Sequence, residues 1–247
     1  MTAVLARHTR AIRQTGIAAV LLGAVLCWPV TTRQSLNHEV TTHRLPLYLK
    51  ATNFIERSAA YERLADQATS GANSDEARVL QAFAWTREHI RPFHDGLPLV
   101  DDHILNIVER GYGMPDQQAD VFATLCTYAG VPAFWKSTHR SDERKGVLLT
   151  YVRLDGRWRV FDVAAGVVFR GVGGTLLTLG DLYGRPQLVP PDVASLDIGG
   201  VRYADLVSRL TMPAVPHPLR AELQMPSRRL WHELKATAGI EPRYESE

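Results

Sequence analysis

The sequence predicts an α+β domain that follows a basic and apolar N-terminal segment. Amphipathic patterns typical of helices fill the chain between residues 53 and 129, and patterns typical of strands follow between residues 131 and 170. Helices followed by strands that tight turns connect are typical of helices packed on an antiparallel sheet. The composition agrees with a folded domain, because 45% of the 247 residues are hydrophobic and 22% are charged.

The start of the chain carries the basic excess. Four of the 28 basic residues precede Glu39, the first acidic residue, so the rest of the chain carries 24 basic residues against 26 acidic ones. A nucleic-acid-binding protein carries its basic excess on the folded body, where phosphates are bound. We therefore expect no nucleic-acid partner.

Residues 14–32 form an uncharged and mostly apolar run. As a helix, such a run would reach roughly 28 Å, close to the thickness of bilayer hydrocarbon. Arg7, Arg10 and Arg13 precede it, a pattern that keeps an N-terminus in the cytoplasm. No small-residue cleavage site follows, so we expect a retained single-pass anchor in the inner membrane, with a periplasmic or otherwise extracytoplasmic body. A cleaved signal peptide is the alternative.

The rest of the chain divides by its composition. We expect a cytoplasmic and anchoring segment at 1–33, a folded domain at 34–188 and a Pro-rich C-terminal extension with a terminal helix at 189–247. The extension has too few apolar residues to form a core alone, so we expect it to wrap the domain. After a polar linker near 31–43, amphipathic patterns predict four helices, at 53–68, 74–90, 101–109 and 116–129.

The fourth predicted helix has the strongest end signals. Pro115 suits its first turn, Asp116 places a negative charge near its positive end, and Gly130 suits its C-terminal cap. Beyond it, Asp155-Gly156 predicts a tight hairpin turn. Strand patterns lie at 131–136, 147–154, 157–163 and 167–170.

The C-terminal extension ends in a predicted amphipathic helix at 227–238. Leu230, Trp231 and Leu234 lie beside three basic residues in it. Such a helix suits an anionic membrane surface or a partner protein. We expect the plainer arrangement, in which the helix packs on its own domain and turns its basic face to solvent.

Two stretches resemble motifs of the transglutaminase-like superfamily, which has the papain-like architecture. Residues 111–133 are similar to the family's run in which a catalytic cysteine opens a helix that ends in a Gly-Ile-Pro-Ala-like turn, here Gly130-Val-Pro-Ala133. Residues 147–162 are similar to its catalytic histidine strand, hairpin, tryptophan and aspartate. The resemblance extends from residue 74 to about residue 181. It implies a papain-like core of N-terminal helices packed on an antiparallel sheet.

The resemblance also implies that the catalytic residues are missing. It places Pro115 at the nucleophile position and Val147 at the base position, whereas Asp162 keeps the carboxylate that orients the histidine. Proline carries no nucleophile and valine cannot carry a proton, so a site aligned in this way cannot perform thiol acyl transfer. If Asp162 is buried it needs a partner, for which Arg159, Arg170 or a backbone amide are candidates.

A domain of this kind is expected to bind rather than to catalyse. The resemblance suggests a binding or scaffolding module in a bacterial cell-envelope or exopolysaccharide system, with a peptide, glycan or envelope protein as its partner. The candidate binding residues are Asp116 and Gln117 at the helix entrance, together with Trp158 and Asp162.

The alternative is a cysteine hydrolase or acyltransferase with a relocated site. Its nucleophile would be Cys126, since Cys27 lies in the apolar run. Cys126 lies ten residues into the fourth predicted helix on its apolar stripe, so we expect a packed, inert thiol. No histidine, cysteine or carboxylate spacing matches a metal site, and we expect no metal or cofactor.

Overall fold

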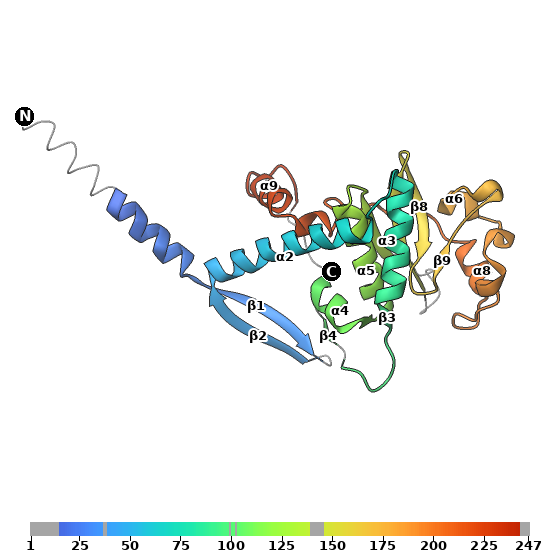
Figure 1. The fold of residues 1–247 in the computed structure, drawn as a ribbon, viewed down its shortest axis with the longest axis horizontal. Coiled ribbons are helices and arrows are strands. Elements are labelled where there is room, and N and C mark those ends of the chain that lie inside the picture. The colour runs from blue at the N-terminus through green and yellow to red at the C-terminus, as the bar shows by residue number, and fades with distance from the viewer. Residues whose placement is uncertain (1–14, 37–38, 99, 102, 139–145, 243–247) are drawn as a thin grey trace, which may run out of the picture. The chain divides into compact units, whose positions relative to one another are not determined.

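The computed structural model describes residues 15–36, 39–98, 100–101, 103–138 and 146–242 (Figure 1). It contains two units, which we describe separately. The N-terminal unit comprises residues 1–56 and 98–102, and the main unit comprises residues 57–97 and 103–247. Helix α2, Leu47–Ala68, crosses the boundary between them in the sequence.

The N-terminal unit contains a long β-hairpin. Strand β1, Pro29–Leu36, pairs antiparallel with β2, Glu39–Pro46, along the whole length of both strands. Strand β4, Val100–Asp101, pairs with the end of β1. The polar linker predicted near 31–43 is therefore wrong. Its residues include several threonines, and β-branched side chains favour the extended backbone of a strand.

The apolar run at 14–32 is only partly helical. Residues 15–26 form a helix, and β1 begins three residues later at Pro29. The apolar side chains of this helix are exposed, at Ile17, Val20, Leu21, Leu22, Val25 and Leu26. Among the residues that the structure describes, none of the helices combines the length and the apolar content needed to span a bilayer. The transmembrane helix expected at 14–32 is thus not supported.

The main unit begins with the helices that the sequence predicts. Ser74 caps α3 through its hydroxyl, which accepts a hydrogen bond from Ala77 N at 3.1 Å. Helix α4 is capped at its C-terminal end by Gly111, whose φ of 69° is in the left-handed region that glycine adopts readily. These helices are α2, α3 at Asp75–His89, α4 at Ile104–Arg110 and α5 at Pro115–Tyr128.

A four-stranded antiparallel sheet follows, in the order β6-β7-β8-β9. Asp155 and Gly156 form the predicted turn between β7 and β8, both with positive φ. An α+β architecture is therefore confirmed. The strands are β6 at Ala133–Thr138, β7 at Val147–Leu154, β8 at Arg157–Asp162 and β9 at Val167–Val168. A short parallel pair, β3 at Arg91–Pro92 and β5 at Tyr112–Gly113, lies outside this sheet.

Each face of this sheet packs against its own apolar core. Successive side chains of a strand point to opposite faces. Val152 and Phe161 belong to a first core with α2, α3, α4 and α5, whereas Leu149 and Tyr151 belong to a second core with the C-terminal region. Figure 1 shows α3 and α5 on one side of the sheet, and α6 and α8 on the other.

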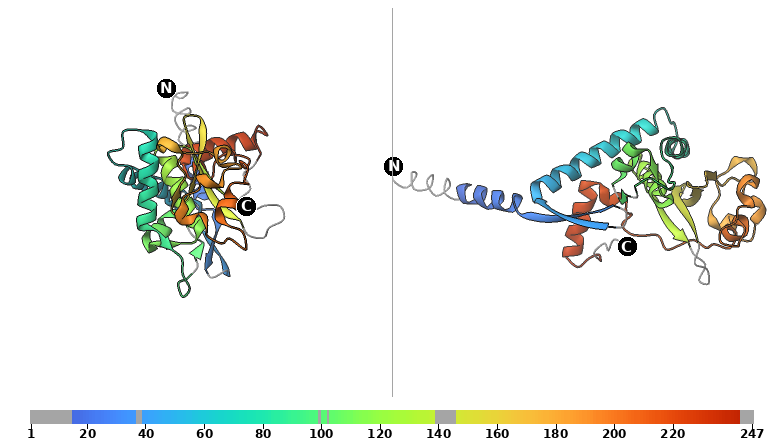
Figure 2. Two further views of the ribbon diagram at one scale, coloured as in Figure 1. Left: turned by 90° about the vertical axis from the view of Figure 1, so that its right-hand side faces the viewer. Right: turned by 90° about the horizontal axis from the view of Figure 1, so that it is seen from below.

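The C-terminal region completes the second core. We use this name for the described residues 176–242, whose α-helices are α6 at Leu179–Leu182, α7 at Pro191–Ala194, α8 at Tyr203–Val207 and α9 at Pro226–Thr237. Val193, Leu206 and Leu219 pack in the same core as the sheet residues. Residues on both sides of position 188 therefore share one core. Figure 2 shows the chain after α8 running past the sheet to α9.

Candidate functional site

Asp162 ends strand β8 and is buried, with 4% of its surface exposed. Its Oδ1 accepts a hydrogen bond from Ala165 N at 2.8 Å, and its Oδ2 accepts one from the Tyr203 hydroxyl at 2.7 Å. Burial raises the pKa of Asp162, and these two hydrogen bonds and the positive charge of Arg87 offset part of the shift. Both carboxylate oxygens are thus engaged inside the protein.

One expected partner of Asp162 is confirmed, since a backbone amide donates to it. The two candidate arginines bind elsewhere: Arg159 donates to the Leu176 carbonyl at 2.6 Å, and Arg170 donates to the Gly174 carbonyl. Tyr203 was not predicted. Burial, followed by the neighbouring Asp162 carboxylate, raises the pKa of the Tyr203 hydroxyl, so it remains a proton donor.

Val147 is the first residue of β7 and packs in the second core. The register pairs Thr150 with Phe161, which places Asp162 and Val147 on the same face of the sheet. The C-terminal region covers this face. By contrast, the buried side chains of α5 such as Phe122 pack in the first core, on the opposite face. Val147, at the position of the expected base, and Asp162, at that of the expected carboxylate, therefore lie on the same face of the sheet, and both are buried.

The start of α5 is a separate, exposed place. Pro115 is the first residue of the helix, and Asp116 beside it is also exposed. Gln117 fixes the helix start, because its Oε1 accepts hydrogen bonds from Met114 N at 3.0 Å and from Arg110 at 2.9 Å. In the part of the chain that the structure describes, no hydrogen bond or ion pair joins this helix start to Asp162 or Trp158.

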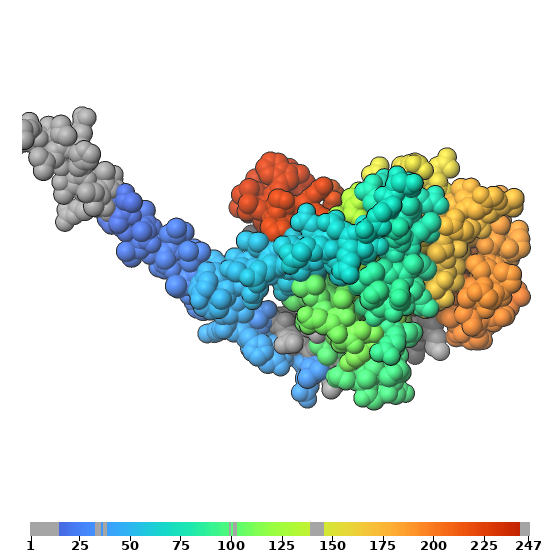
Figure 3. All heavy atoms as spheres, viewed as in Figure 1, coloured from blue at the N-terminus to red at the C-terminus, as the bar shows by residue number. Residues whose placement is uncertain are grey.

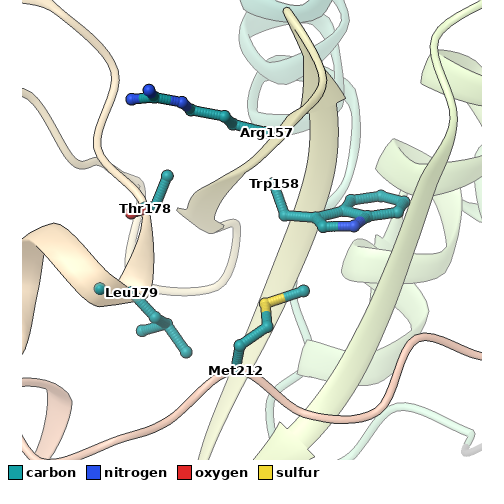
Figure 4. Close-up of a pocket in the computed structure, with 6 residues that line it drawn as sticks. Arg157, Trp158, Thr178, Leu179 and Met212 are labelled. Carbon is teal, nitrogen blue, oxygen red and sulfur yellow. The ribbon is translucent and has the colours of Figure 1, made fainter.

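Trp158 lines a shallow pocket on the main unit. Its ring packs edge-on against Phe134, with the ring centroids 5.0 Å apart. The pocket has a volume of about 380 Å³, which suits one large side chain or a small ligand. Figure 4 shows Trp158, Leu179 and Met212 around it, with Arg157 extending beside it. The lining residues are Arg157, Trp158, Thr178, Leu179, Gly180 and Met212.

The chemistry of this pocket is apolar with one cation. Thr178 is committed to capping α6, because its hydroxyl accepts a hydrogen bond from Asp181 N at 3.2 Å and donates one to Asp181 Oδ2 at 2.8 Å. Arg157 is exposed. The pocket therefore suits a ligand that presents an apolar or aromatic group next to a carboxylate. Of the four candidate binding residues, only Trp158 lines the pocket; Asp116, Gln117 and Asp162 do not.

Cys126 is fully buried among the apolar residues of α5. Burial raises the pKa of its thiol far above neutral pH, so the thiol stays protonated. A nucleophile requires a thiolate that a substrate can reach, and Cys126 meets neither requirement. The expectation of a packed thiol is confirmed.

A polar cluster that sequence reasoning missed joins the C-terminal region to α5. Asp120 Oδ1 accepts a hydrogen bond from Trp135 Nε1 at 3.1 Å, and Asp120 Oδ2 lies 3.1 Å from the Arg220 guanidinium. The same guanidinium lies over the Trp135 ring, 5.9 Å from its centroid. Arg220 is about half exposed, so this contact contributes modestly to stability.

Two histidines of the described residues make local contacts. His89 Nδ1 lies 2.8 Å from the Trp85 carbonyl oxygen, and His232 Nδ1 lies 3.2 Å from Glu241 Oε2. Within the described residues, histidines, cysteines and carboxylates form no group of three or more that could hold a metal ion.

Comparison with known proteins gives a weak likeness. No family model and no curated protein matches the sequence. A proposed cysteine protease of Cytophaga hutchinsonii is 16% identical with a TM-score of 0.38, over 45% of this chain and 39% of that chain. A proposed protease of Parabacteroides distasonis is 11% identical with a TM-score of 0.33, over 54% of this chain and 35% of that chain. This chain thus spans less than two fifths of the length of either of these two proteins, and the likeness assigns neither a family nor an activity.

Proposed function

We propose that this protein is a non-catalytic binding or scaffolding module of the transglutaminase-like type, attached to the bacterial inner membrane and acting in a cell-envelope or exopolysaccharide system. The observation that carries the proposal is the state of the expected catalytic positions. Pro115 and Val147 cannot perform proton transfer or nucleophilic attack, and the Asp162 carboxylate is bound by Tyr203. The thiol of Cys126 offers no replacement, because it is buried and protonated.

The pocket beside Trp158 is the proposed binding place. Its apolar lining and the exposed Arg157 favour a partner that presents an apolar or aromatic group next to a carboxylate. A peptide segment or an envelope protein presents this combination readily, and an acidic glycan presents the charge together with a ring face. The buried Asp162 contributes to this place only indirectly, because it holds the end of β8, the strand that carries Trp158.

Membrane attachment is proposed through residues 14–32. The apolar side chains of the helix at 15–26 are exposed, and three arginines precede the run in the sequence. Apolar surface of this kind is favourable in lipid and costly in water. The expected topology has a cytoplasmic N-terminus and an extracytoplasmic main unit.

Thiol alkylation of the folded protein in mild detergent tests the absence of catalysis. Cys27 lies in the segment proposed to enter the membrane and is replaced by serine, so that the buried Cys126 is the thiol that reports. We expect iodoacetamide at neutral pH to modify Cys126 only after unfolding in urea, and the unfolded chain is the positive control. Rapid modification of Cys126 in the folded chain would restore the enzyme alternative.

Substitutions in the pocket test the binding role. Arg157→Glu reverses the only charge in the lining, and Met212→Glu places a charge in its apolar part. Both variants are expected to fold and to fail in complementing a deletion strain, because they change the pocket surface. Tyr183→Phe, at another exposed position, is the matched control. Normal complementation by both pocket variants at normal expression would refute this binding place.

Fractionation of cells that produce the chain with a tag at each end tests the attachment. Both tags are expected in the inner membrane fraction, with the C-terminal tag open to protease in spheroplasts. A soluble form that has lost its N-terminal tag would show that the segment is a cleaved signal peptide.

A further inference from the structure

Helix α9, Pro226–Thr237, turns its apolar side outward. Leu230 and Trp231 are each 62% exposed and Leu234 is 54% exposed, whereas His232 is the buried side chain of the helix. The spacing of the three exposed residues places them on one side of a helix. We call Leu230, Trp231 and Leu234 the α9 ridge. The expected packing of this apolar side on the domain is therefore wrong. Figure 3 shows α9, in red, at the surface of the main unit.

Polar contacts instead join α9 to residues just before and just after it in the sequence. His232 Nδ1 lies 3.2 Å from Glu241 Oε2, and Lys235 Nζ donates to Glu241 Oε1 at 2.6 Å. Arg228 donates to Glu222 Oε1 at 3.2 Å. Since these contacts use the side of the helix opposite Leu230, the ridge is left exposed in the described part of the chain.

The charges at the edges of the ridge are balanced. Each of the three basic side chains of α9, Arg228, Arg229 and Lys235, lies within 4.0 Å of a glutamate oxygen. Lys235 Nζ also lies 5.6 Å from the centroid of the Trp231 ring. A partner that binds here is therefore attracted by the apolar residues more than by net charge.

The size of the ridge favours a lipid surface over a protein. Two leucines and one tryptophan that are little more than half exposed offer on the order of 300–400 Å². A stable protein interface buries about 800 Å² on each partner, so two ridges packed together would be too small for a dimer. A helix at a bilayer interface needs only a few apolar side chains to enter the boundary between headgroups and acyl chains, where tryptophan is favoured.

We propose that the α9 ridge rests on the interface of a phospholipid bilayer, held by apolar contact rather than by headgroup charge. The proposal rests on the proposed attachment through residues 14–32, because a tethered main unit meets the bilayer at a high effective concentration. A small apolar contact, too weak to bind a free protein, is then sufficient.

Fluorescence of full chains that carry one exposed cysteine tests this contact. In a Cys27→Ser background, Leu234→Cys places a nitrobenzoxadiazole dye on the ridge, and Val172→Cys, at a residue 99% exposed, provides a water-exposed reference. Cys126 remains unlabelled because it is buried. In phosphatidylcholine vesicles, the dye at 234 is expected to shift to shorter wavelength and to lose most of its emission to nitroxide-labelled lipids, and the dye at 172 is not. Added phosphatidylglycerol is expected to change neither result.

A second variant checks that the ridge itself makes the contact. Leu230→Ser together with Trp231→Ser is expected to return the dye at 234 to water, with the Tm of the main unit unchanged because both side chains are exposed. A dye at 234 that stays in water while the chain floats with the vesicles overturns the ridge proposal alone. A dye that is shielded but not quenched by lipid nitroxides also overturns it, since protein then covers the ridge. Chains that fail to float contradict both the attachment and the ridge.

Discussion

Replacement of Tyr203 by phenylalanine is expected to destabilise the main unit without changing its packing. The substitution removes one hydroxyl group, which lies 2.7 Å from Asp162 Oδ2, and keeps the ring. Tyr203 is 1% exposed, so water cannot replace the lost donor. A hydrogen bond to a charged group contributes about 1.5–3 kcal/mol, and at about 2–4 °C per kcal/mol for a unit of this size the Tm is expected to fall by about 3–12 °C.

The loss of stability is expected to depend on pH. Burial raises the pKa of Asp162, and the Tyr203 hydroxyl is among the groups that lower it again. Without this hydroxyl the pKa rises further. A carboxyl whose pKa is higher in the folded state than in the unfolded state contributes most to stability at low pH, where it is protonated. That contribution is lost as the pH rises through the pKa of the folded state. The deficit of Tyr203→Phe relative to the unmodified chain is therefore largest at neutral pH and shrinks as Asp162 becomes protonated.

The dependence of this deficit on pH is measured by thermal and urea unfolding, which circular dichroism follows from acidic to neutral pH. Tyr183→Phe removes the same atom from an exposed tyrosine and is expected to change the free energy of unfolding by less than about 0.5 kcal/mol. An equal Tm for Tyr203→Phe and the unmodified chain at neutral pH would refute the reasoning. A deficit of the same size at every pH would show that the hydroxyl supports packing and not the carboxylate.

Three further substitutions test the second core and the ends of helices α4 and α5. Leu149→Ala leaves a cavity in the second core and is expected to cost about 2–5 kcal/mol in urea unfolding, whereas an effect under about 1 kcal/mol would mean that the core is loosely packed. Gly111→Ala forces a side chain into a backbone with a φ of 69° and is expected to cost about 1 kcal/mol by the same measurement, with no cost expected if the chain can end α4 differently. Gln117→Ala removes the acceptor of the Met114 amide and is expected to cost about 1 kcal/mol, while Asp116→Asn, one residue earlier, serves as its control; equal effects would contradict the capping role.

Local signals in the sequence predicted much of the fold. Ser74 marked the start of α3, and Asp155-Gly156 marked the turn between β7 and β8, because each acts on its own backbone. The hairpin at 29–46 was missed for a related reason. Threonine-rich polar strands carry no apolar alternation, so they resemble a linker until pairing is known.

Contacts between residues far apart in the chain could not be predicted from the sequence. Tyr203 follows Asp162 by 41 residues and lies in a region with short helices, so no periodic pattern links the two. The orientation of α9 could not be predicted either. Periodicity identified its apolar side, but the buried side chain of the helix is His232, a single polar residue that lies 3.2 Å from Glu241.

The way in which the second core is assembled affects the order of folding. Tyr151 and Val160 end up fully enclosed, yet the segment that shields them continues to Leu219, far later in the chain. A nascent chain therefore exposes one apolar face of its sheet to water until the C-terminal segment has left the ribosome and packed against that face. Synthesis that stalls before Leu219 is made yields an aggregation-prone intermediate, which a chaperone of the holdase type would recognise.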